Sequence, residues 1–154
     1  MYRTILLAYD GSIEGRLALR EGARLAQVCG ARVVLMAVVE PTPEFVAGDG
    51  SAVYIPPDRT EEFQKILDEG KARLIRMGLV PEARLERGDP TEQICKAAQE
   101  IAADLVVVGH HKQGAMARWL KGSVTASLSD TLNCSLLVAR LEISDEALFG
   151  GPVP

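Results

Sequence analysis

The spacing of apolar and polar positions divides the chain into short apolar runs and longer amphipathic segments. The runs predict five strands, at residues 4–9, 32–39, 82–87, 104–108 and 135–140. Apolar residues spaced by three and four predict the intervening helices, which start near residues 12, 63, 89 and 123. Continuous apolar strands joined by helical crossovers are typical of a parallel sheet covered on both faces. The pattern therefore predicts an open, doubly wound α/β fold with a five-stranded parallel sheet.

Two segments fall outside this alternation of strands and helices. Residues 41–58 carry four prolines and form a long connection, which we expect to be a structureless lid, a partner-binding loop or a disordered stretch. The last residues contain Ile143, Leu148 and Phe149 but show no clear period. We therefore expect one domain over residues 1–141 and a C-terminal tail over residues 142–154.

Composition excludes several classes of partner. The 154 residues include 17 Lys and Arg against 21 Asp and Glu, a net charge of −4, so no basic excess favours nucleic acid or acidic membranes. No apolar run approaches the roughly 18 residues of a membrane helix. The N-terminal sequence MYRTILLAYDGS reaches Asp10 too soon for a signal peptide. We expect a soluble, cytoplasmic protein.

The cysteines and histidines do not suggest a metal or redox site. Cys29, Cys95 and Cys134 are widely spaced and contain no C-x-x-C pair, which favours small buried apolar residues. His110 and His111 are the only histidines, and adjacent residues rarely converge on one ion without other ligands. We expect no metal site.

Ligands of a doubly wound sheet bind beyond the C-terminal ends of its strands, where the strand order reverses. Ala8, Tyr9 and Asp10 end the first strand, and Gly109 ends the fourth. If these strands are neighbours, Asp10 faces the loop after Gly109 across a crevice. Its carboxylate could bond ribose hydroxyls or an adenine edge, or it could cap the next helix together with Ser12, which is worth about 1 kcal/mol. Both interpretations stay open.

The loop from Gly109 to Ser123 has the parts of an anion cradle. Glycine permits close backbone approach, and the first-turn amides of Ser123 and Val124 would point outward at the positive end of a helix. Three basic residues raise the local potential, namely Lys112, Arg118 and Lys121. However, Gly-Ser before a helix is also a common N-cap, and neither G-x-G-x-x-G nor a Walker ending is present.

From Tyr2 to about Arg140 the chain resembles the universal stress protein family. The resemblance rests on TILLAYDGS, RVVLMAVVEP, RGDPTEQI and the long segment VVVGHHKQGAMARWLKGSVTASLSDTLNCSLLVAR. The nucleotide-binding branch of that family has Gly, two residues, Gly, nine residues, then Gly-Ser or Gly-Thr. Here Gly109 and Gly122-Ser123 match that spacing, whereas Lys112 stands where the second glycine belongs.

The resemblance implies strand order 3-2-1-4-5 and a dimer formed through the fifth strands. It further implies that Asp10 contacts adenosine and that Val38, after the second strand, offers its backbone to adenine. The ribose and phosphates of ATP or AMP, with or without Mg²⁺, would be held at four positions, Gly109, Gly122, Ser123 and Val124. Ala8, Tyr9 and Lys112 complete the expected site.

Lys112 leaves the ligand question open. Another branch of the family lacks the glycines, is not thought to bind ATP and tends to open its loop with Gly-His-His, as residues 109–111 do here. If the loop requires a positive φ at position 112, lysine costs roughly 1 kcal/mol of strain. If the loop relaxes, the ammonium group can reach a phosphate.

The sequence favours a stress-response regulatory protein that binds an adenine nucleotide, with no catalytic residues. The alternative is a nucleotide-independent dimeric protein that binds other proteins through the same fold. Slow ATP hydrolysis, with His110 or His111 activating water, is a less favoured third interpretation. As an apolar edge strand, SLLVAR at residues 135–140 predicts pairing with a second copy.

Overall fold

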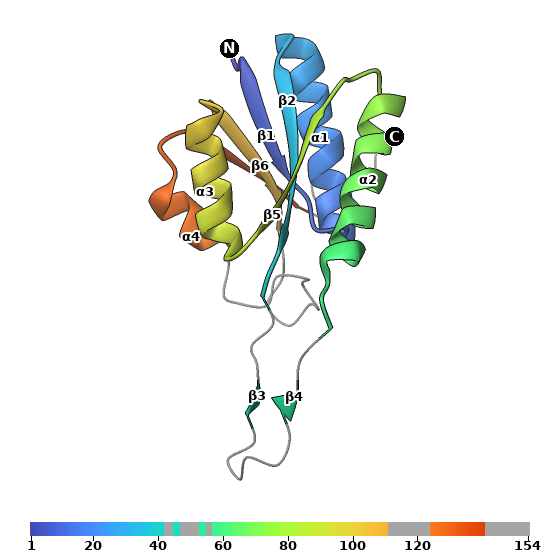
Figure 1. Ribbon diagram of the computed structural model, residues 1–154. Coiled ribbons are helices and arrows are strands. Elements are labelled where there is room, and N and C mark those ends of the chain that lie inside the picture. The colour runs from blue at the N-terminus through green and yellow to red at the C-terminus, as the bar shows by residue number, and fades with distance from the viewer. Residues whose placement is uncertain (42–44, 47–52, 55–56, 111–123, 141–154) are drawn as a thin grey trace, which may run out of the picture.

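The central element is a sheet of five parallel strands (Figure 1). The computed structural model describes residues 1–41, 45–46, 53–54, 57–110 and 124–140, with side chains except at 45–46, 53–54 and 124–126. The strands run in the order β5 (Glu82–Arg87), β2 (Arg32–Val39), β1 (Thr4–Ala8), β6 (Leu105–Gly109) and β7 (Ser135–Ala139). In chain order this is 3-2-1-4-5, so both the predicted fold class and the implied strand order are confirmed.

Helices cover both faces of the sheet, which is why its central strands consist of continuous apolar runs. Helices α1 (Ile13–Cys29) and α2 (Thr60–Arg76) pack against each other on one face, and α3 (Pro90–Glu100) and α4 (Val124–Thr131) lie on the other (Figure 1). Nearby residues in the sequence determine where these helices begin and end. Asp89 caps α3 by accepting from the N–H of Glu92 at 3.0 Å, and Gly30 ends α1 with a φ of 62°.

The strand order reverses at β1, the middle strand. It pairs with β2 on one side, ending at Ala8 opposite Met36, and with β6 on the other, where Leu7 lies opposite Val107. The strands that follow β1 in the chain are therefore added first on one side of it, as β2 and β5, and then on the other side, as β6 and β7. The C-terminal ends of β1 and β6 form the switch point at which ligands of such sheets bind.

The connection over residues 41–58 contains secondary structure, so the expectation of a structureless stretch was wrong, whereas its role as a lid or a partner-binding loop stays a prediction. Two short strands, β3 (Phe45–Val46) and β4 (Val53–Tyr54), pair antiparallel, with Phe45 opposite Tyr54. Aromatic and β-branched residues favour strands, and they flank a segment containing Gly-Asp-Gly in the sequence. The tail predicted at residues 142–154 lies outside the described residues, so the division at residue 141 stays a prediction.

Candidate functional site

A chain of hydrogen bonds joins the end of β1 to the first turn of α1. The Asp10 side chain is buried, and its Oδ1 accepts from the N–H of Ser12 at 3.0 Å and from the Ser12 hydroxyl at 2.5 Å. The Ser12 Oγ in turn accepts from the N–H of Gly15 at 3.0 Å and caps α1. Asp10 therefore supports the helix cap through Ser12, as one of the two interpretations predicted. Its contact with a ligand stays a prediction.

Gly109 at the end of β6 packs directly against this first turn. A Cβ at position 109 would lie 2.6 Å from the Glu14 carbonyl carbon and oxygen and 2.8 Å from the Gly15 nitrogen. A Cβ at Gly15 would lie 2.8 Å from Asp10 Oδ1. The need for glycine at position 109 is thus explained by close packing of α1, independently of any phosphate. The same contacts bring Asp10 and Gly109 together around one helix turn, on adjacent strands as predicted.

Val38 lies within β2 and not after it, which corrects its expected position. β2 has the predicted bounds of 32–39, and its pairing with β5 continues to Val39 opposite Arg87, so Val38 is a paired strand residue. Met36 O accepts from Tyr9 N at 2.9 Å, whereas Val39 O accepts from Gly88 N at 3.0 Å on the other side. Backbone groups alternate along a strand, so the N–H and C=O of Val38 face the β1 side, beyond the last residue of β1.

The remaining predicted site residues are only partly described. Ala8 ends β1 and is buried, and Val124 is the first residue of α4. Lys112, Gly122 and Ser123 lie outside the described residues, as do Arg118, Lys121 and His111. His110 follows β6, and its N–H donates to Ala139 O at 2.8 Å. The match of the loop to a glycine spacing therefore stays a prediction from the sequence.

Tyr9 has a partner that the sequence did not indicate. Its side chain is fully buried, and its hydroxyl donates to Glu69 Oε2 of α2 at 2.5 Å. Glu69 also pairs with Arg73 and, at 3.7 Å, with Arg16. Burial, together with the Glu69 carboxylate, raises the pKa of Tyr9 to about 12. The Tyr9 hydroxyl is thus neutral at physiological pH and is held by α2, whereas the carboxylate of Asp10 is held by α1.

Two of the three free thiols lie at one small cavity. Cys95 of α3 and Cys134, before β7, line a space of about 130 Å³, and all three cysteines are half-buried. Burial raises the pKa of both the Cys95 and Cys134 thiols. A raised pKa keeps a thiol neutral and poorly nucleophilic, so these cysteines pack as small apolar groups.

Other classes of site find little support in the described part of the chain. Among these residues, no group of three or more His, Cys, Asp or Glu side chains is placed to hold a metal ion. None of the described helices is long and apolar enough to cross a membrane.

The fold and sequence are similar to those of known proteins. The model of the universal stress protein family matches residues 1–140. A Thermus aquaticus protein named "Universal stress protein in QAH/OAS sulfhydrylase 3'region" is 32% identical over 142 residues, covering 91% of this chain and all of that protein. A solved universal stress protein in complex with cAMP aligns with a TM-score of 0.69 and 24% identity, covering 92% of this chain and 99% of that one. The Archaeoglobus fulgidus universal stress protein in complex with dAMP has a TM-score of 0.64 and 21% identity, covering 90% and 98%.

Proposed function

The chain belongs to the universal stress protein family, and on that premise we propose that it binds an adenine nucleotide, AMP or ATP, at the C-terminal ends of β1 and β6. One observation carries the proposal: Asp10 and Gly109 adjoin the same first turn of α1 at the point where the strand order reverses. The proposal is also supported by the structurally similar proteins that hold cAMP and dAMP.

Each part of the nucleotide has a matching group in this proposal. The backbone N–H and C=O of Val38 face the side of β1, where they suit the hydrogen-bonding edge of adenine. The Asp10 carboxylate accepts hydrogen bonds, as ribose hydroxyls require. The backbone amides of Ser123 and Val124 at the start of α4 would bind the phosphates. Gly122 would let the backbone approach the phosphates closely, and Lys112 would supply positive charge. Where Mg²⁺ accompanies ATP, it would neutralise phosphate charge.

The proposed role is regulatory and not enzymatic. Nucleotide binding would change the surface that the protein offers to a partner in the cytoplasm, provided that the nucleotide binds two loop arrangements with different affinity. The described crevice residues support binding better than catalysis, because the hydroxyl of Ser12 is engaged in capping α1 and the hydroxyl of Tyr9 in bonding Glu69.

Calorimetric titration with AMP and with ATP, each with and without Mg²⁺, tests the proposal. We expect saturable heat with one nucleotide per chain, together with raised absorbance at 260 nm after denaturation if nucleotide co-purifies. An absence of heat at millimolar nucleotide would reject the proposal and favour a nucleotide-independent role.

We further propose that β7 joins two copies of the chain. β7 is an edge strand, and its sequence SLLVA is apolar, with Leu136, Leu137 and Val138 half-buried in the single chain. The opposite edge, β5, is instead rich in charged side chains, which oppose edge-to-edge pairing. Light scattering at micromolar protein should therefore give about twice the 16.6 kDa mass of one chain. A value for the single chain would contradict the dimer.

A further inference from the structure

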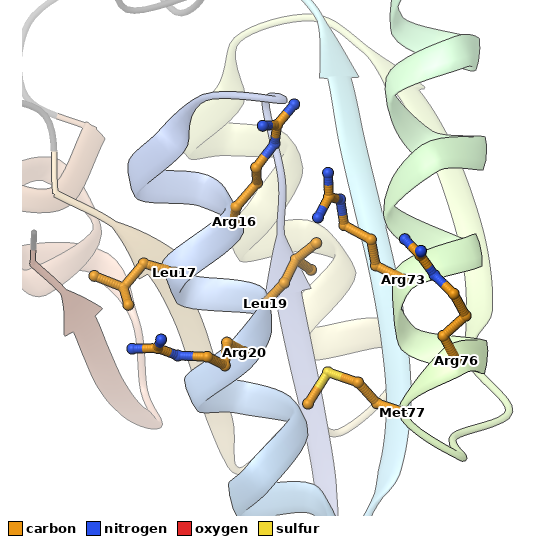
Figure 2. A pocket seen from close by; sticks show the side chains of 7 residues that line it. All are labelled: Arg16, Leu17, Leu19, Arg20, Arg73, Arg76 and Met77. Atoms are coloured by element: carbon orange, nitrogen blue, oxygen red, sulfur yellow. The ribbon is translucent and has the colours of Figure 1, made fainter.

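A groove lined by arginines runs between α1 and α2, and its described lining includes none of the residues proposed to bind the nucleotide. It encloses about 550 Å³ and is lined by Arg16, Leu17, Leu19 and Arg20 of α1 and by Arg73, Arg76 and Met77 at the end of α2. We call it the arginine groove. Figure 2 shows Arg16 and Arg73 extending toward the same end of the groove from the two helices, with Leu19 and Met77 lying between the helices.

The groove is a local concentration of positive charge in an acidic protein. Among the residues that the structure describes, its lining contains four arginines and no acidic residue, although the chain as a whole carries a net charge of −4. Two carboxylates pair with these arginines from outside the lining, Glu69 with Arg16 and Arg73, and Glu21 with Arg20. Arg76 forms no ion pair with any residue that the structure describes. A surplus of positive charge therefore remains in the groove.

Glu69 holds two of the arginines in place. It bonds the Tyr9 hydroxyl through Oε2 and pairs with both Arg73 and Arg16 through Oε1. Burial opposes ionisation of Glu69, but hydrogen bonds from Tyr9 and Arg73 outweigh it and lower the pKa of this carboxyl. Glu69 is therefore ionised at neutral pH, and its charge allows two guanidinium groups to lie near each other with lowered repulsion. The two groups are thus arranged before any ligand arrives.

We propose that the arginine groove binds a small organic anion that carries phosphate or carboxylate groups. Guanidinium groups form paired hydrogen bonds to both kinds of oxyanion. The volume of about 550 Å³ lies within the range of roughly 300–1,000 Å³ that is typical of small-molecule sites. Leu19 and Met77 supply an apolar surface for the body of the ligand, while Arg16, Arg73 and Arg76 meet its charged end.

Nuclear magnetic resonance of the arginine Nε–H groups tests this site, with inorganic pyrophosphate and citrate as probes at low ionic strength. We expect saturable shifts at Arg16, Arg73 and Arg76. Tighter binding of pyrophosphate would assign the site to phosphates, and tighter binding of citrate would assign it to carboxylates. An absence of saturable shifts with both probes would overturn the proposal. These resonances report on the arginine groove, so a negative AMP titration at the crevice would leave the result intact.

A pair of variants separates a built site from general charge attraction. Arg76→Gln removes an arginine that has no described ion pair, so the fold should be retained, and it should weaken probe binding about three- to tenfold through loss of a charge-assisted hydrogen bond. Arg32→Gln removes the same charge from the start of β2, where Arg32 hydrogen-bonds Glu82 at 2.6 and 2.7 Å. It should leave binding within about twofold, since distant exposed charges are screened. Equal weakening by the two variants would contradict a localised site.

Discussion

Tyr9 and Asp10 are consecutive buried residues at the end of β1, yet they belong to different clusters. Asp10 bonds Ser12, two residues further on, and Ser12 caps α1 by accepting from the N–H of Gly15, so this cluster is local in the sequence. Tyr9 bonds Glu69 of α2, sixty positions away, and through it adjoins Arg73 and Arg16. One strand end thus supports both the proposed nucleotide crevice and the arginine groove. The comparison teaches that consecutive residues after one strand can belong to two separate side-chain clusters.

The largest expected effect tests the packing on the Asp10 side. Gly109→Ala would place a Cβ 2.6 Å from the backbone of Glu14, which cannot move without displacing α1. We expect the free energy of unfolding to fall by about 3 kcal/mol, measured by urea denaturation.

Gly70→Ala tests the packing on the Tyr9 side. A Cβ at position 70 would lie 2.7 Å from Tyr9 Cδ1, and we expect the free energy of unfolding to fall by about 2 kcal/mol in the same assay.

Gly30→Ala is the control for both variants. A Cβ at Gly30 meets no atom within 4 Å, but the φ of 62° imposes a conformational cost of about 1 kcal/mol. If Gly109→Ala costs no more than Gly30→Ala, the close packing of β6 against the first turn of α1 is not what requires glycine at position 109.

A smaller effect tests the hydrogen bond on the Tyr9 side. Tyr9→Phe should lower the free energy of unfolding by about 1 kcal/mol at neutral pH, because Glu69 loses a donor. The pKa of Tyr9 is raised from 10.0 to about 12 in the folded protein, so the unfolded chain ionises first. The stability contributed by this raised pKa is therefore present below pH 10 and is lost as the pH rises to about 12.

Urea denaturation at a series of pH values checks this loss of stability with rising pH. The free energy of unfolding of the unaltered protein should exceed that of Tyr9→Phe below pH 10, and this difference should shrink above pH 10. Absorbance at 295 nm should show one tyrosine fewer ionising near pH 12 in the variant. Tyr2→Phe, which leaves the Tyr9–Glu69 hydrogen bond intact, is the control. A difference in the free energy of unfolding that stays constant through pH 12 would contradict the raised pKa of Tyr9.

The fold was predictable because its signals are local. Apolar runs and helical spacing identify the sheet strands and helices, and Ser12, Gly30 and the Asp89-Pro90 pair mark helix ends by their own chemistry. The strand order itself came from the family resemblance. The two-residue strands β3 and β4 were missed, since so short a pair gives no periodicity.

The candidate site was predictable only where its contacts are close in sequence. The Asp10–Ser12 cap could be foreseen, whereas the partnership of Tyr9 with Glu69 depends on how α2 packs on the sheet. The arginine groove was missed for the same reason. Arg16 and Arg20 are four residues apart and Arg73 and Arg76 three apart, which predicts a shared face on each helix but not that the two faces meet.

Titration of AMP into three forms of the protein tests the nucleotide proposal and the comparison together. The unaltered protein should bind one AMP per chain. Asp10→Asn keeps an oxygen for the Ser12 cap but removes the charged acceptor, and it should weaken binding about tenfold. Tyr9→Phe should bind AMP as the unaltered protein does, because the Tyr9 hydroxyl is held by Glu69. No heat at millimolar AMP, or equal weakening by the two variants, would contradict the assignment of the nucleotide to the Asp10 side of β1.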